Sequence, residues 1–296
     1  MRSESFLKMI ESAHIIKIAI EAGEAAMEIY EKDFTVEYKE DKSPLTEADR
    51  RAHKVIVDGL KKISLPAVRG GDERMASLPI LSEEGRDIPY EVRRKWERYW
   101  CVDPIDGTKE FIKKSGEFTV NIALIHQRRP VFGVVYAPAL KEIYWAKKGE
   151  GAWKAPVDDQ GKIVDSKKEG LPLSLDEKTR KSGEFVIVAS KSHLNAETRD
   201  FIERASRNKE CVRSISKGSS LKLLMVAEGS ADIYPRLGPT MEWDTAAADA
   251  IVRESGKKTY VYEKGVEEAA IDLQETKYRL LQYNKRDLLN PWFIVG

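Results

Sequence analysis

Two aspartates, Asp103 and Asp106, stand three residues apart in the stretch DPIDGT, directly after a run of apolar residues. Because the ring of Pro104 fixes its own φ and restrains the residue before it, this turn is stiff and can aim both carboxylates at one point. The carbonyl of Ile105 lies between them, and hard cations such as Mg²⁺ prefer oxygen ligands of these kinds. The pattern indicates a metal site, but an ordinary Asx-type turn has the same spacing.

The last two residues of this stretch suit an anion. Gly107 allows a close approach to the backbone. Thr108 offers a hydroxyl and a backbone N–H at what we expect to be the start of a short helix.

Other acidic residues occupy comparable positions. Glu83 and Glu84 follow another apolar strand end, and Asp244 follows Trp243 at the start of a predicted helix. A single acidic residue at a helix N-terminus is usually a cap, so Asp244 alone would not indicate chemistry. Carboxylates that converged without a cation would repel one another strongly, and a bound metal would remove that conflict. A purely structural protein leaves the clustered carboxylates unexplained.

Composition limits the class of protein. The chain has 296 residues, of which 42% are hydrophobic and 33% are charged, as in a globular protein of one large domain or two fused ones. The 50 basic and 49 acidic residues give a net charge of +1, which argues against a nucleic-acid partner. No apolar run is long enough to span a bilayer, and no signal peptide is recognisable. Cys101 and Cys211 form neither a disulfide framework nor a zinc knuckle, so we expect a reducing compartment, most simply the cytoplasm.

Hydrophobic periodicity predicts the elements that position these groups. Apolar residues from Met9 to Tyr30 recur at spacings of four and three, which is typical of a long amphipathic helix. Thr46 suits the N-cap of the next helix, and Asp49 falls where a capping box places an acidic group. The pattern predicts strands at 34–38, 80–81, 99–102, 118–125, 131–136, 143–146, 185–189 and 231–234, and helices at 196–205, 221–227 and 245–254. The strand at 99–102 is expected to stop at Asp103-Pro104.

Two segments lack this order. The stretch from Pro66 to Pro79 carries a glycine pair, two prolines and mixed charge, which predicts a mobile surface loop. Residues 149–183 are rich in Gly, Lys, Asp and Ser and are the best candidate for a connecting segment. Hairpin signals before that segment and alternating strands and helices after it predict an α/β protein of two layered lobes, at 1–155 and 156–296.

Three motifs together resemble the lithium-sensitive, magnesium-dependent phosphatases of the inositol monophosphatase superfamily. They are Leu81-Ser82-Glu83-Glu84, the DPIDGT stretch and Trp243-Asp244-Thr245-Ala246-Ala247. Within the superfamily the chain is most similar to the CysQ-type 3'(2'),5'-bisphosphate nucleotidases. That similarity rests on Ser43–Asp49, Lys109–Ile112, Gly116–Asn121, Ser190–His193, Gly218–Lys222, Tyr234–Arg236 and Leu289–Pro291.

The resemblance implies an αβαβα sandwich of the inositol monophosphatase and fructose-1,6-bisphosphatase type, and it assigns roles to residues. Two or three Mg²⁺ ions would be held by Glu83, Asp103, the carbonyl of Ile105, Asp106 and Asp244. Thr108 would help to deprotonate the attacking water, Asp49 would polarise Thr108, and Glu83 counts with them as catalytic. From the residues alone, capping and catalysis explain Asp49 equally well. The implied substrate contacts are Ile105, Asp106, Gly107, Thr108, Ser190, His193, Gly218, Lys222 and Asp244.

The implied reaction is hydrolysis of adenosine 3',5'-bisphosphate to AMP and phosphate, with 3'-phosphoadenylyl sulfate as a second substrate in sulfur metabolism. Activity on inositol monophosphate or fructose 1,6-bisphosphate is the alternative on the same fold, and a catalytically silent nucleotide sensor is another.

Arg236 could approach a second phosphate. Ala248 stands where the family usually has glycine, which predicts a slight shift of the helix that carries Asp244. The resemblance leaves open a monomer or a homodimer, and a cytoplasmic enzyme or one at the periphery of the inner membrane.

Overall fold

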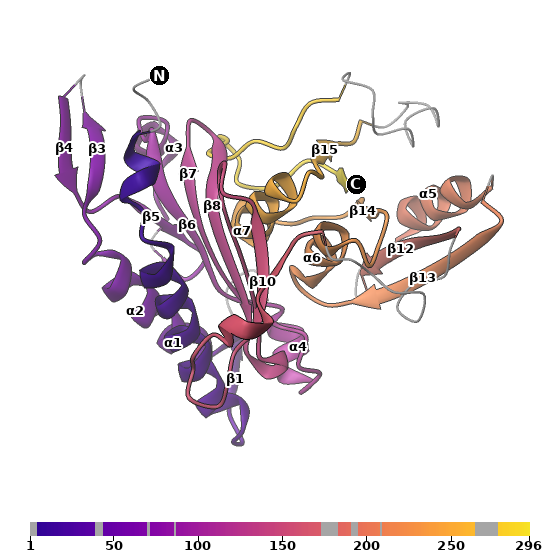
Figure 1. The fold of residues 1–296 in the computed structure, drawn as a ribbon, viewed down its shortest axis with the longest axis horizontal. Coiled ribbons are helices and arrows are strands. Elements are labelled where there is room, and N and C mark those ends of the chain that lie inside the picture. Colours follow the sequence, from indigo (N-terminus) through magenta and orange to yellow (C-terminus); the bar gives the residue numbers. More distant parts are fainter. Residues whose placement is uncertain are drawn as a thin grey trace.

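A seven-stranded sheet forms the centre of the protein in the computed structural model (Figure 1). The structure describes residues 5–38, 44–69, 72–85, 87–172, 183–190, 195–207, 209–263 and 278–296. The sheet has the order β11-β10-β9-β8-β7-β6-β5, and its neighbours pair antiparallel except for the parallel pair β5–β6. The strands are β5 (Ile80–Ser82), β6 (Arg98–Asp106), β7 (Thr119–His126), β8 (Arg129–Ala137), β9 (Glu142–Lys147), β10 (Ala152–Pro156) and β11 (Glu169–Gly170).

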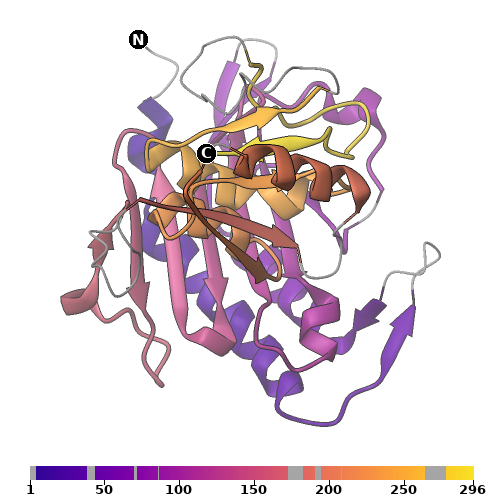
Figure 2. The same ribbon diagram turned by 90° about the vertical axis from the view of Figure 1, so that its right-hand side faces the viewer.

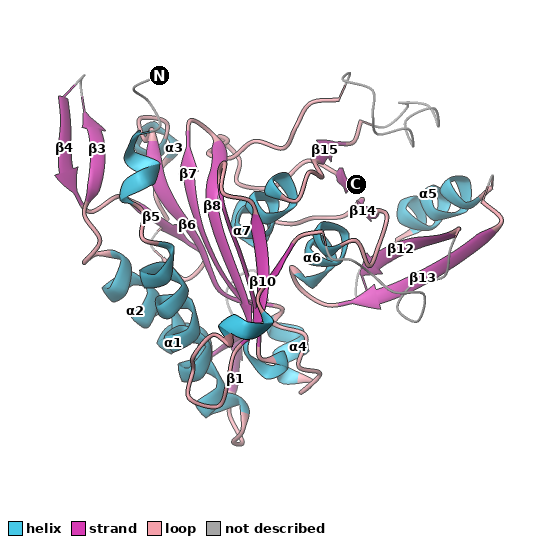
Figure 3. Ribbon diagram, in the orientation of Figure 1, coloured by secondary structure: helices cyan, strands magenta, loops and turns pink. Residues whose placement is uncertain are grey.

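Helices cover both faces of this sheet. The predicted amphipathic helices α1 (Ser12–Tyr30) and α2 (Glu47–Leu60) pack on one face, and α6 (Leu221–Glu228) and α7 (Glu242–Glu254) lie on the other (Figure 3). The apolar stripe of α1 is buried with the inner faces of β6, β7 and β8 in one large cluster, so core packing accounts for that stripe.

Smaller sheets and one helix complete the layers. Strands β12 (Glu184–Ser190) and β13 (Cys211–Lys217) pair in parallel, and β14 (Tyr234–Arg236), β16 (Phe293–Val295) and β15 (Thr259–Val261) form a second small sheet. Figure 2 shows helix α5 (Ala196–Ser206) outside β12 and β13. The succession of helices, large sheet, helices, small sheets and helix confirms the predicted αβαβα architecture.

Helix α7 approaches the large sheet closely because β8 carries a glycine at the contact. A Cβ added to Gly133 would lie 2.2 Å from the carbonyl oxygen of Ala247, far inside van der Waals contact. Ala248, where the family resemblance predicts a glycine, is fully buried in α7. The glycine that allows α7 and the sheet to pack closely is thus Gly133 on the strand, whereas the family pattern predicts a glycine on the helix.

Strand β6 does not stop at Asp103-Pro104 as predicted, since it continues to Asp106. Its pairing with β7 shifts register between Asp103 and Asp106. Because Pro104 has no N–H to donate, the ladder is interrupted there, and such an irregularity re-aims the side chains around it. The candidate ligands thus lie on a distorted strand end rather than on a loop.

Two predicted loops contain strands. In the stretch from Pro66 to Pro79, β3 (Leu65–Arg69) and β4 (Asp72–Ala76) pair antiparallel, so the prediction of a loop was wrong there. Both strands are edges of a two-stranded sheet, where proline is tolerated. Within 149–183, β10 and β11 extend the large sheet, and a 3-10 turn spans Asp165–Lys167.

Other boundaries differ by a few residues. Strand β1 (Val36–Tyr38) starts later than predicted and pairs with β2 (Pro44–Thr46). The strand expected at 231–234 is an isolated bridge from Ile233 to Ile187 that precedes β14. The remaining helices are α3 (Tyr90–Arg93), α4 (Thr108–Ile112) and the 3-10 turns Ser5–Met9 and Pro138–Leu140. Among the described residues, no helix has the length and apolar character needed to cross a bilayer.

Candidate active site

A cavity of about 260 Å³ lies where β6 ends and where α4, α6 and α7 begin. Ten of the twelve residues predicted from the sequence line it, namely Glu83, Asp103, Ile105, Asp106, Gly107, Thr108, Ser190, Gly218, Lys222 and Asp244. Asp49 is not part of its lining, and His193 lies outside the described residues. The fold therefore brings together groups separated by up to about 160 positions in the chain.

The aspartate turn is held by its own backbone. The N–H of Ile105 donates to Oδ1 of Asp103 at 3.0 Å, and the hydroxyl of Thr108 lies 3.4 Å from the carbonyl oxygen of Ile105. Gly107 has a φ of +92°, a left-handed conformation that favours glycine. This glycine is the N-cap of the short helix α4, so the predicted helix start at Thr108 is confirmed.

The carboxylates that line the cavity repel one another. Burial raises the pKa of Asp103 well above its usual range, and the negative charges of Glu83 and Asp106 raise it further. Burial and the charge of Asp106 likewise raise the pKa of Asp244 well above its usual range. The pKa of Asp106 is also raised by burial, while Lys222 and Ser220 oppose the shift. A divalent cation among these oxygens would offset both the repulsion and the loss of water.

The donor set fits Mg²⁺ by its chemistry. Carboxylates and the Ile105 carbonyl are hard oxygen ligands, and they line a single cavity. Within the described ranges, no three histidine, cysteine, aspartate or glutamate side chains are placed to hold one ion together. Mg²⁺ is commonly bound by one or two carboxylates and completes its octahedron with water and phosphate oxygens. The arrangement thus suits ions that are shared with a phosphorylated substrate better than an all-protein cage.

Cationic side chains line the same cavity. Lys222 is buried in the first turn of α6, and burial lowers its pKa to about 8 although the charge of Asp106 opposes the shift. Its Nζ donates to the carbonyl oxygen of Ser219 at 2.5 Å. Arg236 and the exposed Lys109 also line the cavity. A region of positive charge beside the carboxylates can hold an anion that does not itself contact the metal ions.

Sequence reasoning missed some of these residues. Lys109, Glu110 and Tyr234 line the cavity but were not predicted to be site residues. Lys109 and Glu110 directly follow Thr108 and begin a stretch that carries the family resemblance, which was a signal for both. Tyr234 begins another of these stretches, Tyr234–Arg236, which was the same kind of signal.

The structure forms the capping box predicted at Asp49. The backbone N–H of Thr46 donates to Oδ2 of Asp49 at 2.8 Å, and the Thr46 hydroxyl donates to the same oxygen at 2.7 Å. Asp49 is 2% exposed, and its charge contributes to the raised pKa of Asp103. The capping role is therefore present, and the catalytic role of Asp49 stays a prediction.

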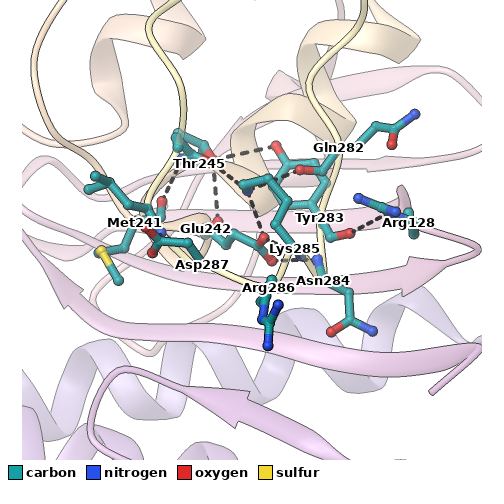
Figure 4. A network of polar contacts seen from close by, with 12 residues as sticks. Arg128, Met241, Glu242, Thr245, Gln282, Tyr283, Asn284, Lys285, Arg286 and Asp287 are labelled. Atoms are coloured by element: carbon teal, nitrogen blue, oxygen red, sulfur yellow. Dashed lines mark hydrogen bonds and ion pairs between the residues drawn. The ribbon is translucent and has the colours of Figure 1, made fainter. Parts of the chain in front are cut away.

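Helix α7 is fixed at the end that carries Asp244. The N–H of Met241 donates to Oδ2 of Asp244 at 2.9 Å, which makes Asp244 part of the helix cap. Figure 4 shows the neighbouring carboxylate of Glu242 among donors from the segment that carries Asn284 and Lys285. Asn290 donates to the carbonyl oxygen of Met241 at 2.8 Å. Hydrogen bonds from the C-terminal segment at Asn284, Lys285 and Asn290 thus fix the first turn of α7.

Comparisons with known proteins place the chain in a family. A model of the inositol monophosphatase family matches residues 10–286. The 3'(2'),5'-bisphosphate nucleotidase CysQ of Salmonella typhimurium is 40% identical over 285 residues, which are 95% of this chain and 97% of that protein. Its counterpart from Escherichia coli strain K12 is 40% identical over 286 residues, at 95% and 98% coverage.

Solved structures give the same grouping. The crystal structure of CysQ from Bacteroides thetaiotaomicron, a bacterial member of the inositol monophosphatase family, is 44% identical with a TM-score of 0.77 and covers 96% of each chain. An inositol monophosphatase from Thermotoga maritima is 25% identical with a TM-score of 0.64, and the match covers 95% of this chain and 89% of that one.

Proposed function

Because the chain belongs to the inositol monophosphatase family and is a phosphatase of that family, we propose that it hydrolyses the 3'-phosphate of adenosine 3',5'-bisphosphate to give AMP and phosphate. One observation carries the proposal: five carboxylates line a single cavity, four of them predicted metal ligands, and Lys109, Lys222 and Arg236 lie beside them. A bisphosphate needs two anion sites, one at the metal ions and one at the cationic side chains. The name of the relatives at 40% identity supports this substrate.

The metal site would be built from the five predicted ligands, Glu83, Asp103, the Ile105 carbonyl, Asp106 and Asp244. When bound, two or three Mg²⁺ ions lower the pKa of water and neutralise the charge on the phosphoryl group. The repulsion among the carboxylates of the cavity supports this assignment, because a bound cation would relieve it.

The protein's own groups would place the reacting atoms. The Thr108 hydroxyl, at the start of α4, would orient the attacking water and accept its proton while it passes its own proton toward the Asp49 carboxylate. The backbone amides of Gly107 and Thr108 would face the phosphate oxygens. The water oxygen forms its bond to phosphorus while the bond to the ribose O3' breaks, and the leaving oxygen takes up a proton from a second water molecule.

The second phosphate and the nucleoside would lie toward α6 and β12. Lys222 and Arg236 are buried cations at this side of the cavity, and Gly218 and Ser190 line it. A Cβ at Gly218 would lie 2.8 Å from the carbonyl oxygen of Glu117, so the backbone approaches closely at this point. His193 is assigned to the same region by resemblance alone.

Further properties belong to the same proposal. We expect 3'-phosphoadenylyl sulfate as a second substrate, inhibition by Li⁺, and a role in clearing a by-product of sulfate assimilation or sulfotransfer. The protein would act in the cytoplasm, without nucleic-acid partners, as a monomer or a homodimer. The division into lobes at 1–155 and 156–296 stays a proposal as well.

Phosphate release from three substrates tests the assignment. Adenosine 3',5'-bisphosphate, inositol 1-phosphate and fructose 1,6-bisphosphate are compared side by side with Mg²⁺, and again after Li⁺ is added. We expect a strong preference for the bisphosphate nucleotide, loss of turnover in Asp103→Asn, and a raised KM in Lys222→Met. Equal or greater turnover of inositol 1-phosphate or fructose 1,6-bisphosphate would overturn the substrate assignment and leave the metal site in place. Tight nucleotide binding without turnover in Mg²⁺ would identify a sensor instead.

A further inference from the structure

We propose that Ser220 is a positioning residue that fixes two of the proposed metal ligands, Asp106 and Asp244, relative to each other. The inference rests on the metal site of the proposed function. Ser220 directly precedes α6 and is 1% exposed. Its Oγ lies 2.8 Å from Oδ2 of Asp106 and 2.7 Å from the main-chain carbonyl oxygen of Asp244. A single hydroxyl therefore touches the end of β6 and the first turn of α7.

The direction of these bonds follows from the groups around the hydroxyl. The amide Nδ2 of Asn121 donates to Oγ of Ser220 at 2.9 Å. A serine hydroxyl has one hydrogen and can accept with its lone pairs. Because Asn121 occupies the accepting side, the hydrogen of Ser220 is left for Asp106 or for the carbonyl of Asp244, and both are within reach. A bond to the charged carboxylate is the stronger of the two.

Asn121 is well placed to hold Ser220. It lies on β7 directly opposite Asp103 of β6, in the centre of the large sheet, and is 1% exposed. In the described part of the chain its Oδ1 has no hydrogen-bond partner. The side-chain amide of Asn121 is therefore held through the bond from its Nδ2 to Ser220. The rigid sheet thus determines where the hydroxyl sits.

The position of Ser220 also connects the proposed substrate-binding segment with the proposed metal ligands. It lies between Gly218 and Lys222, on the segment proposed to contact the substrate, while its hydroxyl contacts the proposed ligands. Groups that orient metal ligands from behind commonly change metal affinity or activity 10–100-fold when they are removed. Loss of this hydroxyl is therefore expected to weaken cation binding more than substrate binding.

Binding of Mn²⁺, measured by electron paramagnetic resonance without substrate, is the first test. We expect Ser220→Ala to weaken Mn²⁺ binding about tenfold or more, and Asn121→Ala to weaken it less. The double variant should be no weaker than Ser220→Ala alone, because Asn121 acts through the hydroxyl. Ser255→Ala is the matched control, since it removes another buried hydroxyl at the far end of α7, where it donates to the Val252 carbonyl oxygen. Unchanged Mn²⁺ binding in Ser220→Ala, or equal weakening in Ser255→Ala, would overturn the inference.

Kinetics separate positioning from a general structural role. In Ser220→Ala the Mg²⁺ concentration for half-maximal rate should rise about tenfold, while KM for the nucleotide at saturating Mg²⁺ stays within about twofold. If the substitution merely displaced α6, Lys222 would move as well and KM would rise, which contradicts the inference. If Ser220→Ala does not fold, Asn121→Ala gives the same readouts. A wild-type protein that binds Mn²⁺ in a Ser220-dependent way but does not hydrolyse the nucleotide would refute the proposed function alone.

Discussion

Lys285 donates to Oε1 of Glu242 at 2.6 Å, and the two residues are 43 positions apart in the sequence. The same carboxylate accepts the backbone N–H of Asn284 at 2.6 Å and that of Lys285 at 2.9 Å. Glu242 is fully buried in the first turn of α7, two residues before Asp244. The start of the helix that carries a proposed metal ligand is thus determined by a segment close to the C-terminus.

Removal of Glu242 should be strongly destabilising. Glu242→Ala leaves two backbone N–H groups without their acceptor and takes the charged partner from the half-buried Lys285 ammonium, which is expected to cost about 3 kcal/mol. Glu242→Leu combined with Lys285→Met should recover part of this loss, because an apolar pair needs no compensation. Urea unfolding measures both variants. Glu263→Ala removes one partner of the exposed pair with Arg279 and should have no measurable effect. Equal losses in Glu242→Ala and Glu263→Ala would contradict the prediction.

The sequence predicted much of the candidate site because local motifs carry its chemistry. The DPIDGT stretch encodes the turn itself, since Pro104 and Gly107 impose their conformations from within. Hydrophobic periodicity likewise predicted α1 and α2, whose buried faces follow the helical repeat.

Contacts between distant segments were not predictable in this way. The contact of Asn121 with Ser220 and that of Glu242 with Lys285 join residues 99 and 43 positions apart. Neither pair leaves a pattern in one sequence, because polar residues that become buried partners look like surface residues until the chain folds. The extension of β6 past Pro104 was missed for a related reason, since pairing with β7 outweighs a local signal to stop.

Asp103→Asn should stabilise the metal-free protein while it abolishes activity. The side chain is 1% exposed and lies among other negative charges, so removing its charge relieves repulsion. An amide can keep the bond from the Ile105 N–H through its oxygen. We expect a gain of about 1 kcal/mol or more in EDTA, which is about 2–4 °C in Tm for a chain of this size. Thermal unfolding with EDTA and with Mg²⁺ measures it, and Mg²⁺ should raise Tm of the wild type far more than that of the variant.

Asp249→Asn is the matched control for that experiment. Asp249 is also a fully buried aspartate, but Arg253 lies 2.8 Å from it and the Tyr283 hydroxyl donates to it at 3.0 Å. Neutralising this paired charge should lower Tm in EDTA and in Mg²⁺ alike. A fall of Tm in Asp103→Asn of the same size would show that Asp103 is not under repulsion.

Gly133→Ala should be among the most damaging small substitutions in the sheet. The added methyl would overlap the carbonyl oxygen of Ala247, and backbone cannot move aside as a flexible side chain can. We expect a loss of about 2–3 kcal/mol or more, with weaker Mg²⁺ binding because α7 carries Asp244. Ala248→Gly should cost only about 1 kcal/mol, the usual difference in helix propensity. A Cβ at Gly238 meets nothing within 4 Å, so Gly238→Ala is the control, and urea unfolding compares all three.

The two roles of Asp49 can be separated by substitution. Asp49 is the third helical residue of the capping box whose N-cap is Thr46, and an Asn amide oxygen can accept the same two bonds. Asp49→Asn should therefore change the free energy of unfolding by less than about 1 kcal/mol. If Asp49 also supports Thr108 in activating water, kcat should fall about 10²–10⁴-fold in the same variant. Asp49→Ala should lose both kcat and about 1 kcal/mol of stability. Full kcat in Asp49→Asn would leave the cap as the whole role of this residue.

The pH dependence of kcat/KM should reveal the buried ammonium of Lys222. Burial lowers its pKa to about 8, so the positive charge is complete well below that pH and is lost as the pH rises through it. Since an anionic substrate needs the charge, kcat/KM at saturating Mg²⁺ should fall between pH 7.5 and 9.5, on the order of tenfold per unit above the pKa. Lys222→Arg keeps its charge over this range and should lose the falling limb, whereas Lys109→Arg, at an exposed position of the same cavity, should retain it. An unchanged limb in Lys222→Arg would assign the titration to another group.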